Sequence, residues 1–141
     1  MDFHDVVAAL RALEDPSLDN ETHEKACDFL ASLDEKEEAR DLVKSLESEK
    51  VSVRWDAANI LAGLGIQSIC AILKALMDPN RVGHPRLREG VLHVYHELQD
   101  PELKAKMTPL IESFRGPAPD ITSMWVAYRI LESIDDEICG K

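Results

Sequence analysis

Apolar residues recur along this chain at the spacing of amphipathic helices. Near the amino terminus they occupy Phe3, Val6, Val7, Leu10 and Leu13. This i, i+3, i+4, i+7 spacing puts them on one helix face, and no later segment keeps the alternation of a half-buried strand. Proline, glycine and aspartate clusters separate the helical segments, so the pattern predicts an all-α fold of about eight helices. The clusters lie at 15–16, 34–37, 63–65, 78–80, 83, 100–101 and 116–120.

Two apolar templates alternate along these segments. The first, called A, consists of Ala57, Ala58, Ile60, Leu61 and Leu64, and it recurs from Ala26, Val91 and Ala127. The second, called B, consists of Ile72, Leu73 and Leu76, and it recurs from Val6, Leu42 and Leu110. The helices therefore follow the order B, A-B, A-B, A-B, A. Because one pair is too small to bury its own apolar face, we expect the pairs to stack into a single domain over 1–141.

Segment 51–65, with the sequence VSVRWDAANILAGLG, resembles the first helix of a HEAT repeat, in the short bacterial style of phycobilisome-lyase-type HEAT proteins. Its Val-Arg, Ala-Ala and Leu-Gly elements fall where that pattern has them, and the helix after Leu87-Arg88 matches more loosely. The resemblance implies a short right-handed α-solenoid of HEAT-like helix pairs. It implies fold far more than function, since HEAT repeats serve unrelated functions.

Charge adds a strong asymmetry to this architecture. The 141 residues include 27 Asp and Glu against 16 Lys and Arg, which leaves a net charge of −11. Residues 1–50 hold 15 of the acids and 6 of the bases, so this part alone carries −9. We expect neither nucleic acid nor a membrane as the partner, because both present negative charge. With 45% hydrophobic residues, the chain is also too apolar for a disordered acidic tail.

The acidic half suggests one functional hypothesis, an acidic neutraliser such as an immunity or anti-activator protein. It would cover a basic site on a toxin or regulator, and its binding would weaken with salt. The residues expected to face that partner are Glu35, Glu37, Glu38 and Asp41. Because the three glutamates lie at a corner open to solvent, we expect no raised pKa there. A solvated face that keeps the chain soluble is the competing interpretation.

The main hypothesis is a non-catalytic protein-protein interaction module or adaptor. In HEAT stacks the B helices line the concave side, so the positions opposite their apolar stripe form the expected groove. One row of this groove contains Ala8, Lys44, Lys74 and Glu112, and the neighbouring row contains Asp41. Such a groove suits an extended or helical peptide, while ordinary solvent-facing positions are the alternative.

Trp55 and Trp125 occupy one repeat position, which the other repeats fill with Glu24 and Glu89. A position that accepts glutamate is not expected in the deep core, so each Trp either covers a neighbouring helix or serves as an exposed binding anchor. The final A helix has no B partner. Its apolar positions Met124, Trp125, Val126 and Tyr128 predict a dimer or a hetero-complex through the C-terminal end.

Histidine and glutamate supply the candidates for metal chemistry. The cluster at 93–97 lacks the His spacing of a zinc-protease helix. Deoxyhypusine hydroxylase, an enzyme that resembles this repeat architecture, uses His-Glu dipeptides to hold iron. Here His23-Glu24 and His96-Glu97 occupy different places in the repeat, so they do not form a symmetrical pair. We expect no catalytic residue, cofactor or metal site, and a lyase-like or metal-dependent enzyme is the second alternative.

The three cysteines Cys27, Cys70 and Cys139 stand far apart, without the close pairs of disulfide scaffolds or zinc modules. We therefore expect reduced thiols in a cytoplasmic protein. The first residues also lack the basic region of a secretory leader. Cys27 aligns with the A-template position of Ala58, which predicts a small buried side chain.

Overall fold

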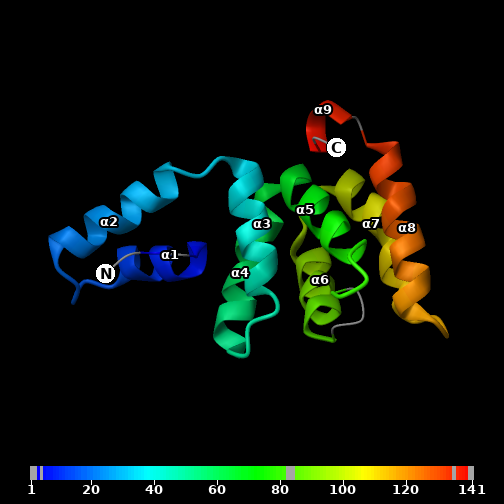
Figure 1. The fold of residues 1–141 in the computed structure, drawn as a ribbon, viewed down its shortest axis with the longest axis horizontal. Helices are drawn as coiled ribbons and strands as arrows, with labels where there is room; N and C mark the ends of the chain where they lie inside the picture. Colours follow the sequence, from blue (N-terminus) through cyan, green and yellow to red (C-terminus); the bar gives the residue numbers. More distant parts are fainter. Residues whose placement is uncertain (1–2, 4, 82–84, 135, 140–141) are drawn as a thin grey trace.

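The computed structural model describes residues 3, 5–81, 85–134 and 136–139 (Figure 1). These residues form eight longer helices, one short helix and no strand, so the all-α prediction is confirmed. The helices are α1 (Val6–Glu14), α2 (Asn20–Ala31), α3 (Glu35–Ser45), α4 (Val51–Leu64), α5 (Ile66–Leu76), α6 (Pro85–Glu97), α7 (Pro101–Ser113), α8 (Pro119–Ser133) and α9 (Asp136–Cys139). None of these helices combines the length and the apolar character that crossing a membrane requires.

Aspartate side chains begin several of the helices. Those of Asp5, Asp19, Asp34 and Asp100 accept backbone hydrogen bonds in the first turns of α1, α2, α3 and α7. Asp34 also forms a capping box with Glu37, whose side chain accepts from the Asp34 backbone. Each cap satisfies backbone donors and sets negative charge at the positive end of a helix dipole. Part of the acidic charge therefore stabilises helix ends.

The helices are distributed along one long axis, with α1 and α2 at one end and α8 at the other (Figure 1). At the amino-terminal end α1 and α2 form a hairpin, in which α2 packs chiefly against α1. Farther along, α3 packs against α4 and α5, α4 packs against α6, and α8 packs against both α5 and α7. This arrangement of packed helix pairs is compatible with a helical solenoid.

The last helix pair departs from the layering that the repeat predicts. Alternating templates place α7 beside α5, but the structure sets α8 beside α5 and leaves α7 in contact mainly with α8 and α6. The reason lies in α5, because eight of its eleven residues are buried and such a helix must be covered on several sides. The helices α3, α8 and α9 provide that cover. The expected row of groove positions is therefore interrupted after α5.

Two apolar clusters of unequal size hold the helices together. The main core is centred on α5 and includes side chains from α1, α3, α4, α6, α7 and α8. A small cluster made of Phe3, Ala9, Ala12 and Ala26 joins α1 to α2. Because alanine buries little apolar area, we expect α2 to be held more weakly than the helices around α5.

A disulfide joins α9 to α5, which shows that the expectation of three reduced thiols is wrong. Cys70 and Cys139 are 69 positions apart in the sequence, yet their Cα atoms lie 5.4 Å apart. The spacing of the cysteines along the sequence could not predict this pair, because the two residues meet only when α9, which follows α8, packs against α5. The predicted burial of Cys27 is also wrong, since its thiol is free and exposed on the outlying helix α2.

Candidate binding surfaces

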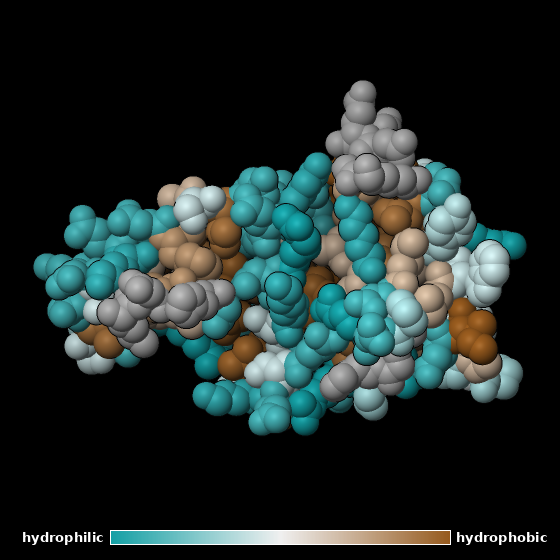
Figure 2. Space-filling model, viewed as in Figure 1, coloured by the Kyte–Doolittle hydropathy of each residue, from teal (hydrophilic) through white to brown (hydrophobic). Residues whose placement is uncertain are grey.

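An exposed apolar surface covers the outer side of α8, and we call it the α8 patch. It consists of Met77, Ile121, Met124, Trp125 and Tyr128, which surround an open depression of about 630 Å³. Trp125 is 63% exposed and Ile121 is 65% exposed, values unusual for large apolar side chains. Figure 2 shows hydrophobic surface at the end of the molecule where α8 begins. Contiguous exposed apolar surface of this kind is typical of interaction sites.

The opposite face of α8 fixes the orientation of the patch. Ser123, Ala127, Ile130 and Leu131 are buried, and α8 packs through this face against α5 and α7. Ser123 Oγ lies 2.9 Å from Ser113 Oγ of α7, so a buried hydrogen bond sets the register of the two helices. With this face anchored, the side of α8 that carries Trp125 is left to solvent.

The apolar positions proposed for the C-terminal helix are divided between surface and core. Trp125 and Tyr128 are exposed, whereas Val126 is partly buried against the main core. Sequence reasoning missed Ile121 and Met77. Ile121 is four residues before Trp125, so helical periodicity alone could have found it. Met77 follows α5, and only the packing of α8 on α5 brings it to the patch.

Trp55 lies in a different environment, although it shares the repeat position of Trp125. It is 56% exposed, and its ring meets the ring of His93 edge-on at 4.7 Å. The adjoining depression is also lined by the charged residues Arg54 and Glu89. Trp55 thus bridges α4 and α6 beside polar neighbours, whereas the described residues that line the depression beside Trp125 are all apolar or aromatic.

The first part of the expected groove lies between α1 and α3, as an open depression of about 750 Å³. The structure brings Ala8, Lys44 and Asp41 together there. Asp41 is partly buried, and its Oδ2 accepts a hydrogen bond of 2.8 Å from the Val6 backbone N–H. Burial raises the pKa of Asp41, partly offset by the Val6 hydrogen bond, and the nearby Asp5 also raises it. Asp41 therefore helps to attach α1 to α3.

The other two members of the expected row lie elsewhere. Lys74 lines a separate pocket beside α9, and Glu112 is exposed on α7, which does not continue the row from α5. The sequence alone gave no reason to separate these positions. Their separation follows from the way α8, rather than α7, covers α5.

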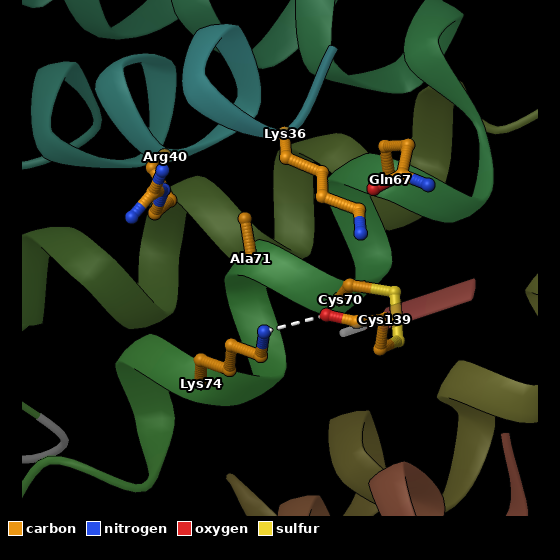
Figure 3. A pocket seen from close by; sticks show the side chains of 7 residues that line it. All are labelled: Lys36, Arg40, Gln67, Cys70, Ala71, Lys74 and Cys139. Atoms are coloured by element: carbon orange, nitrogen blue, oxygen red, sulfur yellow. Dashed lines mark hydrogen bonds between the residues drawn. A yellow bond between two sulfur atoms is a disulfide. The ribbon is translucent and has the colours of Figure 1, made fainter. Parts of the chain in front are cut away.

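A basic pocket lies between α3, α5 and α9 (Figure 3). Its volume is about 210 Å³. Lys74 Nζ donates a hydrogen bond of 2.6 Å to the Cys139 carbonyl, and Gln67 Nε2 donates one of 3.1 Å to the Ile138 carbonyl. These bonds and the disulfide hold α9 as one wall. The residues that line the pocket are Lys36, Arg40, Gln67, Cys70, Ala71, Lys74 and Cys139.

The remaining acids proposed to face a basic partner have mixed environments. Glu37 is exposed but also caps α3. Glu38 is half-buried, and burial raises its pKa, with a further contribution from the negative charge of Glu35. The expectation that no glutamate of this corner has a raised pKa is therefore wrong for Glu38. Its side chain sits closer to the packed face of α3 than the corner position suggested.

The three histidines that the structure describes, His23, His93 and His96, make local contacts. His23 Nε2 lies 2.8 Å from the Asp15 carbonyl oxygen, and His93 Nε2 lies 3.0 Å from Asn59 Oδ1. The rings of His96 and Tyr95 meet edge-on. Within the part of the chain that the structure describes, no three His, Cys, Asp or Glu side chains gather as metal ligands.

Comparison with known proteins adds no family assignment. No family model matches the chain, and no significant match is found among the curated proteins or the solved structures. The resemblance to HEAT repeats therefore rests on segment 51–65, and the packed helix pairs are compatible with it.

Proposed function

We propose that this chain is a non-catalytic protein-protein interaction module that binds a helix of a partner protein on the α8 patch. The observation that carries the proposal is the pair of large apolar side chains, Ile121 and Trp125, that α8 holds in solvent at the end of the stack. Leaving such surface exposed is unfavourable, and covering it supplies binding free energy.

The position of α8 in the stack supports a helix as the occupant. The helix α5 has α3 on one side and α8 on another, whereas the main packing partners of α8 among the described helices are α5 and α7. A partner helix on the α8 patch would continue the stack by one more helix. Among the described residues, none that lines the depression beside Trp125 is charged, so its complement is the apolar face of an amphipathic helix.

The matched pair of tryptophans provides the test. The chain is used to capture partners from its native lysate, and the protein recovered in stoichiometric amount is identified, purified and titrated against the variants. We expect Trp125→Ser to weaken binding by at least about tenfold, the effect of losing a central aromatic anchor. Trp55→Ser removes an equally exposed tryptophan from the same repeat position and should leave binding unchanged.

Salt gives a second readout for the same titration. Binding through apolar surface should change little between low and high salt, because screening acts on charges. Equal loss of affinity in both tryptophan variants, or no loss in either, would contradict the proposal. So would a complex that dissociates as salt is raised. Sedimentation of the chain alone identifies the case in which the partner is a second copy.

The acidic neutraliser is the alternative, and the position of α2 favours it. This helix packs chiefly on α1, so it stands out at the amino-terminal end with Glu21, Glu24 and Asp28 exposed (Figure 1). The triple change of these acids to Gln or Asn should abolish capture of a basic partner while leaving the fold intact. A complex that is unaffected by this change and by salt would exclude the neutraliser.

The compartment is also part of the proposal. We propose a cytoplasmic location, in which a disulfide such as Cys70–Cys139 is uncommon unless it responds to redox conditions. Rapid acid quenching of native cells, followed by thiol alkylation, measures the state of this pair. A cytoplasmic protein should show a fraction with both thiols reduced, whereas complete oxidation in growing cells would contradict this location.

A further inference from the structure

We propose that the basic pocket between α3, α5 and α9 is a phosphate-binding site. The ligand is inorganic phosphate or the phosphate group of a small phosphomonoester. Lys36 and Arg40 reach the pocket from successive turns of α3, and Lys74 reaches it from α5 (Figure 3). Arginine and lysine together are the side chains that phosphate recognition uses most, since both donate charge-assisted hydrogen bonds.

The charge balance at this place is opposite to that of the molecule. The chain carries 27 acidic residues and a net charge of −11, yet no Asp or Glu is among the described side chains that line the pocket. Among the described residues, Lys36 and Arg40 have no carboxylate within ion-pair distance. Lys36 and Arg40 lie one helical turn apart, so their like charges repel each other, and a bound anion would offset that repulsion.

The size of the pocket restricts the ligand. At about 210 Å³ it is smaller than the roughly 300–1,000 Å³ typical of sites for drug-sized ligands. It therefore suits a single anionic group better than a nucleotide or another large cofactor. A phosphate dianion offsets the charges of both Lys36 and Arg40, whereas a carboxylate offsets only one of them.

The disulfide makes the site sensitive to redox state. It ties Cys139, which belongs to the pocket wall, to Cys70 of α5, and the Cys139 carbonyl holds Lys74 Nζ. Reduction by a dithiol breaks the bond between the two sulfurs, leaves two thiols on the protein and forms a disulfide in the reductant. The short helix α9 then loses its covalent attachment, and the pocket loses a fixed wall. Phosphate should consequently bind more tightly to the oxidised chain.

The first experiment titrates the oxidised protein with inorganic phosphate and with glycerol 3-phosphate at constant ionic strength. Acetate serves as the carboxylate control. We expect saturable one-to-one binding of at least one phosphate compound, and about tenfold weaker binding of acetate. The tighter of the two phosphate compounds identifies the source of the ligand. Failure of both to bind, or acetate binding as tightly as they do, would overturn the proposal.

Paired variants locate the site. The double variant Lys36→Gln/Arg40→Gln should weaken phosphate binding by about tenfold or more, because it removes two charge-assisted partners. The control Lys44→Gln/Lys50→Gln removes two cations that lie in the groove beside α1 instead, so its affinity should equal that of the unaltered chain. Equal weakening in both double variants would mean that only net charge matters, and would overturn the site.

Two experiments test the coupling between the disulfide and phosphate binding. One removes the disulfide and measures phosphate affinity, and the other adds phosphate and measures disulfide stability. The variant Cys70→Ala/Cys139→Ala, once circular dichroism shows that it is folded, should bind phosphate several-fold more weakly. By thermodynamic reciprocity, saturating phosphate should raise the ratio of oxidised to reduced chain in a dithiothreitol buffer by the same factor. No change in either quantity would overturn the link between disulfide and ligand. These experiments leave the α8 patch untouched, so their outcome is independent of the proposed protein-binding function.

Discussion

The two ends of the helical stack differ in the interactions that hold them and in the residues that they expose. At the amino-terminal end, Val6 and Val7 anchor α1 in the main core, whereas an alanine-rich cluster holds α2 on α1. Polar contacts add to this attachment, including the bond of Arg11 to Asp56 at 2.6 Å. At the carboxyl-terminal end, α8 packs on the almost wholly buried α5, and a disulfide adds α9. The exposed residues differ in the same way, with acids on α2 and apolar side chains on α8.

The exposed acidic residues of α2 and the exposed apolar surface of α8 therefore lie at opposite ends of the molecule. The acidic end has little exposed apolar area to offer a partner, and its outer helix α2 is held by the weaker set of contacts. The carboxyl-terminal end has a rigid base beneath its exposed tryptophan, so a partner that binds there loses little free energy in ordering the surface. We therefore expect the two ends to respond differently to mutation, salt and pH.

The largest expected effect comes from the base of the carboxyl-terminal end. Leu73 of α5 is fully buried in the main core. Leu73→Ala removes apolar contacts and leaves a cavity, which should lower the free energy of unfolding by about 2–5 kcal/mol. Urea denaturation measures this loss. A loss of under about 1 kcal/mol would mean that α5 is not the centre on which the stack depends.

A smaller effect is expected where α6 approaches the end of α3. A Cβ atom added at Gly90 would lie 3.0 Å from the Leu46 side chain. Gly90→Ala should therefore destabilise the chain by about 1–3 kcal/mol through overpacking. The control is Gly63→Ala in α4, where no atom lies within 4 Å and alanine should stabilise the helix by about 0.4–1 kcal/mol. The same sign for both changes in thermal unfolding would contradict this packing.

The smallest expected effect concerns pH at the amino-terminal end. Because the pKa of Asp41 is raised in the folded chain, its contribution favours folding at pH below its ordinary value of 3.8 and is lost as pH rises through the raised pKa. Asp41→Asn should remove this pH dependence and keep the bond to Val6, so the variant should be as stable as the unaltered chain at pH 7, or more so.

Asp41→Ala serves as the control for that bond. It leaves the Val6 N–H without its acceptor and should cost about 1 kcal/mol at pH 7. Urea denaturation at pH 3 and pH 7 distinguishes the three proteins. If the Asn and Ala variants lose equal stability at pH 7, the charged carboxylate itself attaches α1, and the assigned pKa direction is wrong.

Much of the fold could be predicted from the sequence because helical periodicity is a local property. The spacing of apolar residues identified an all-α chain, and the clusters of Asp, Pro and Gly marked where helices begin and end. The pairing of α5 with α8 could not be predicted in this way. It depends on how much of α5 needs cover, which is a property of the assembled core.

The candidate binding surfaces likewise combine features that the sequence predicts with features that only long-range packing creates. The exposure of Trp125 agrees with its repeat position, because another repeat carries Glu there. The basic pocket was missed because Lys36 and Arg40 come from α3 while Lys74 comes from α5. The disulfide was missed because its two cysteines meet only after α9 packs against α5. Contacts between distant segments leave no signal in the spacing of one sequence.

The most direct test of the proposed function is amide hydrogen exchange of the chain with and without its captured partner. Exchange reports where backbone opening is suppressed, and it compares both ends of the molecule in one measurement. If the partner binds the α8 patch, protection should increase in 119–133 and stay unchanged in 20–31. Protection that appears in α2 and not in α8 would contradict the account and favour the acidic neutraliser.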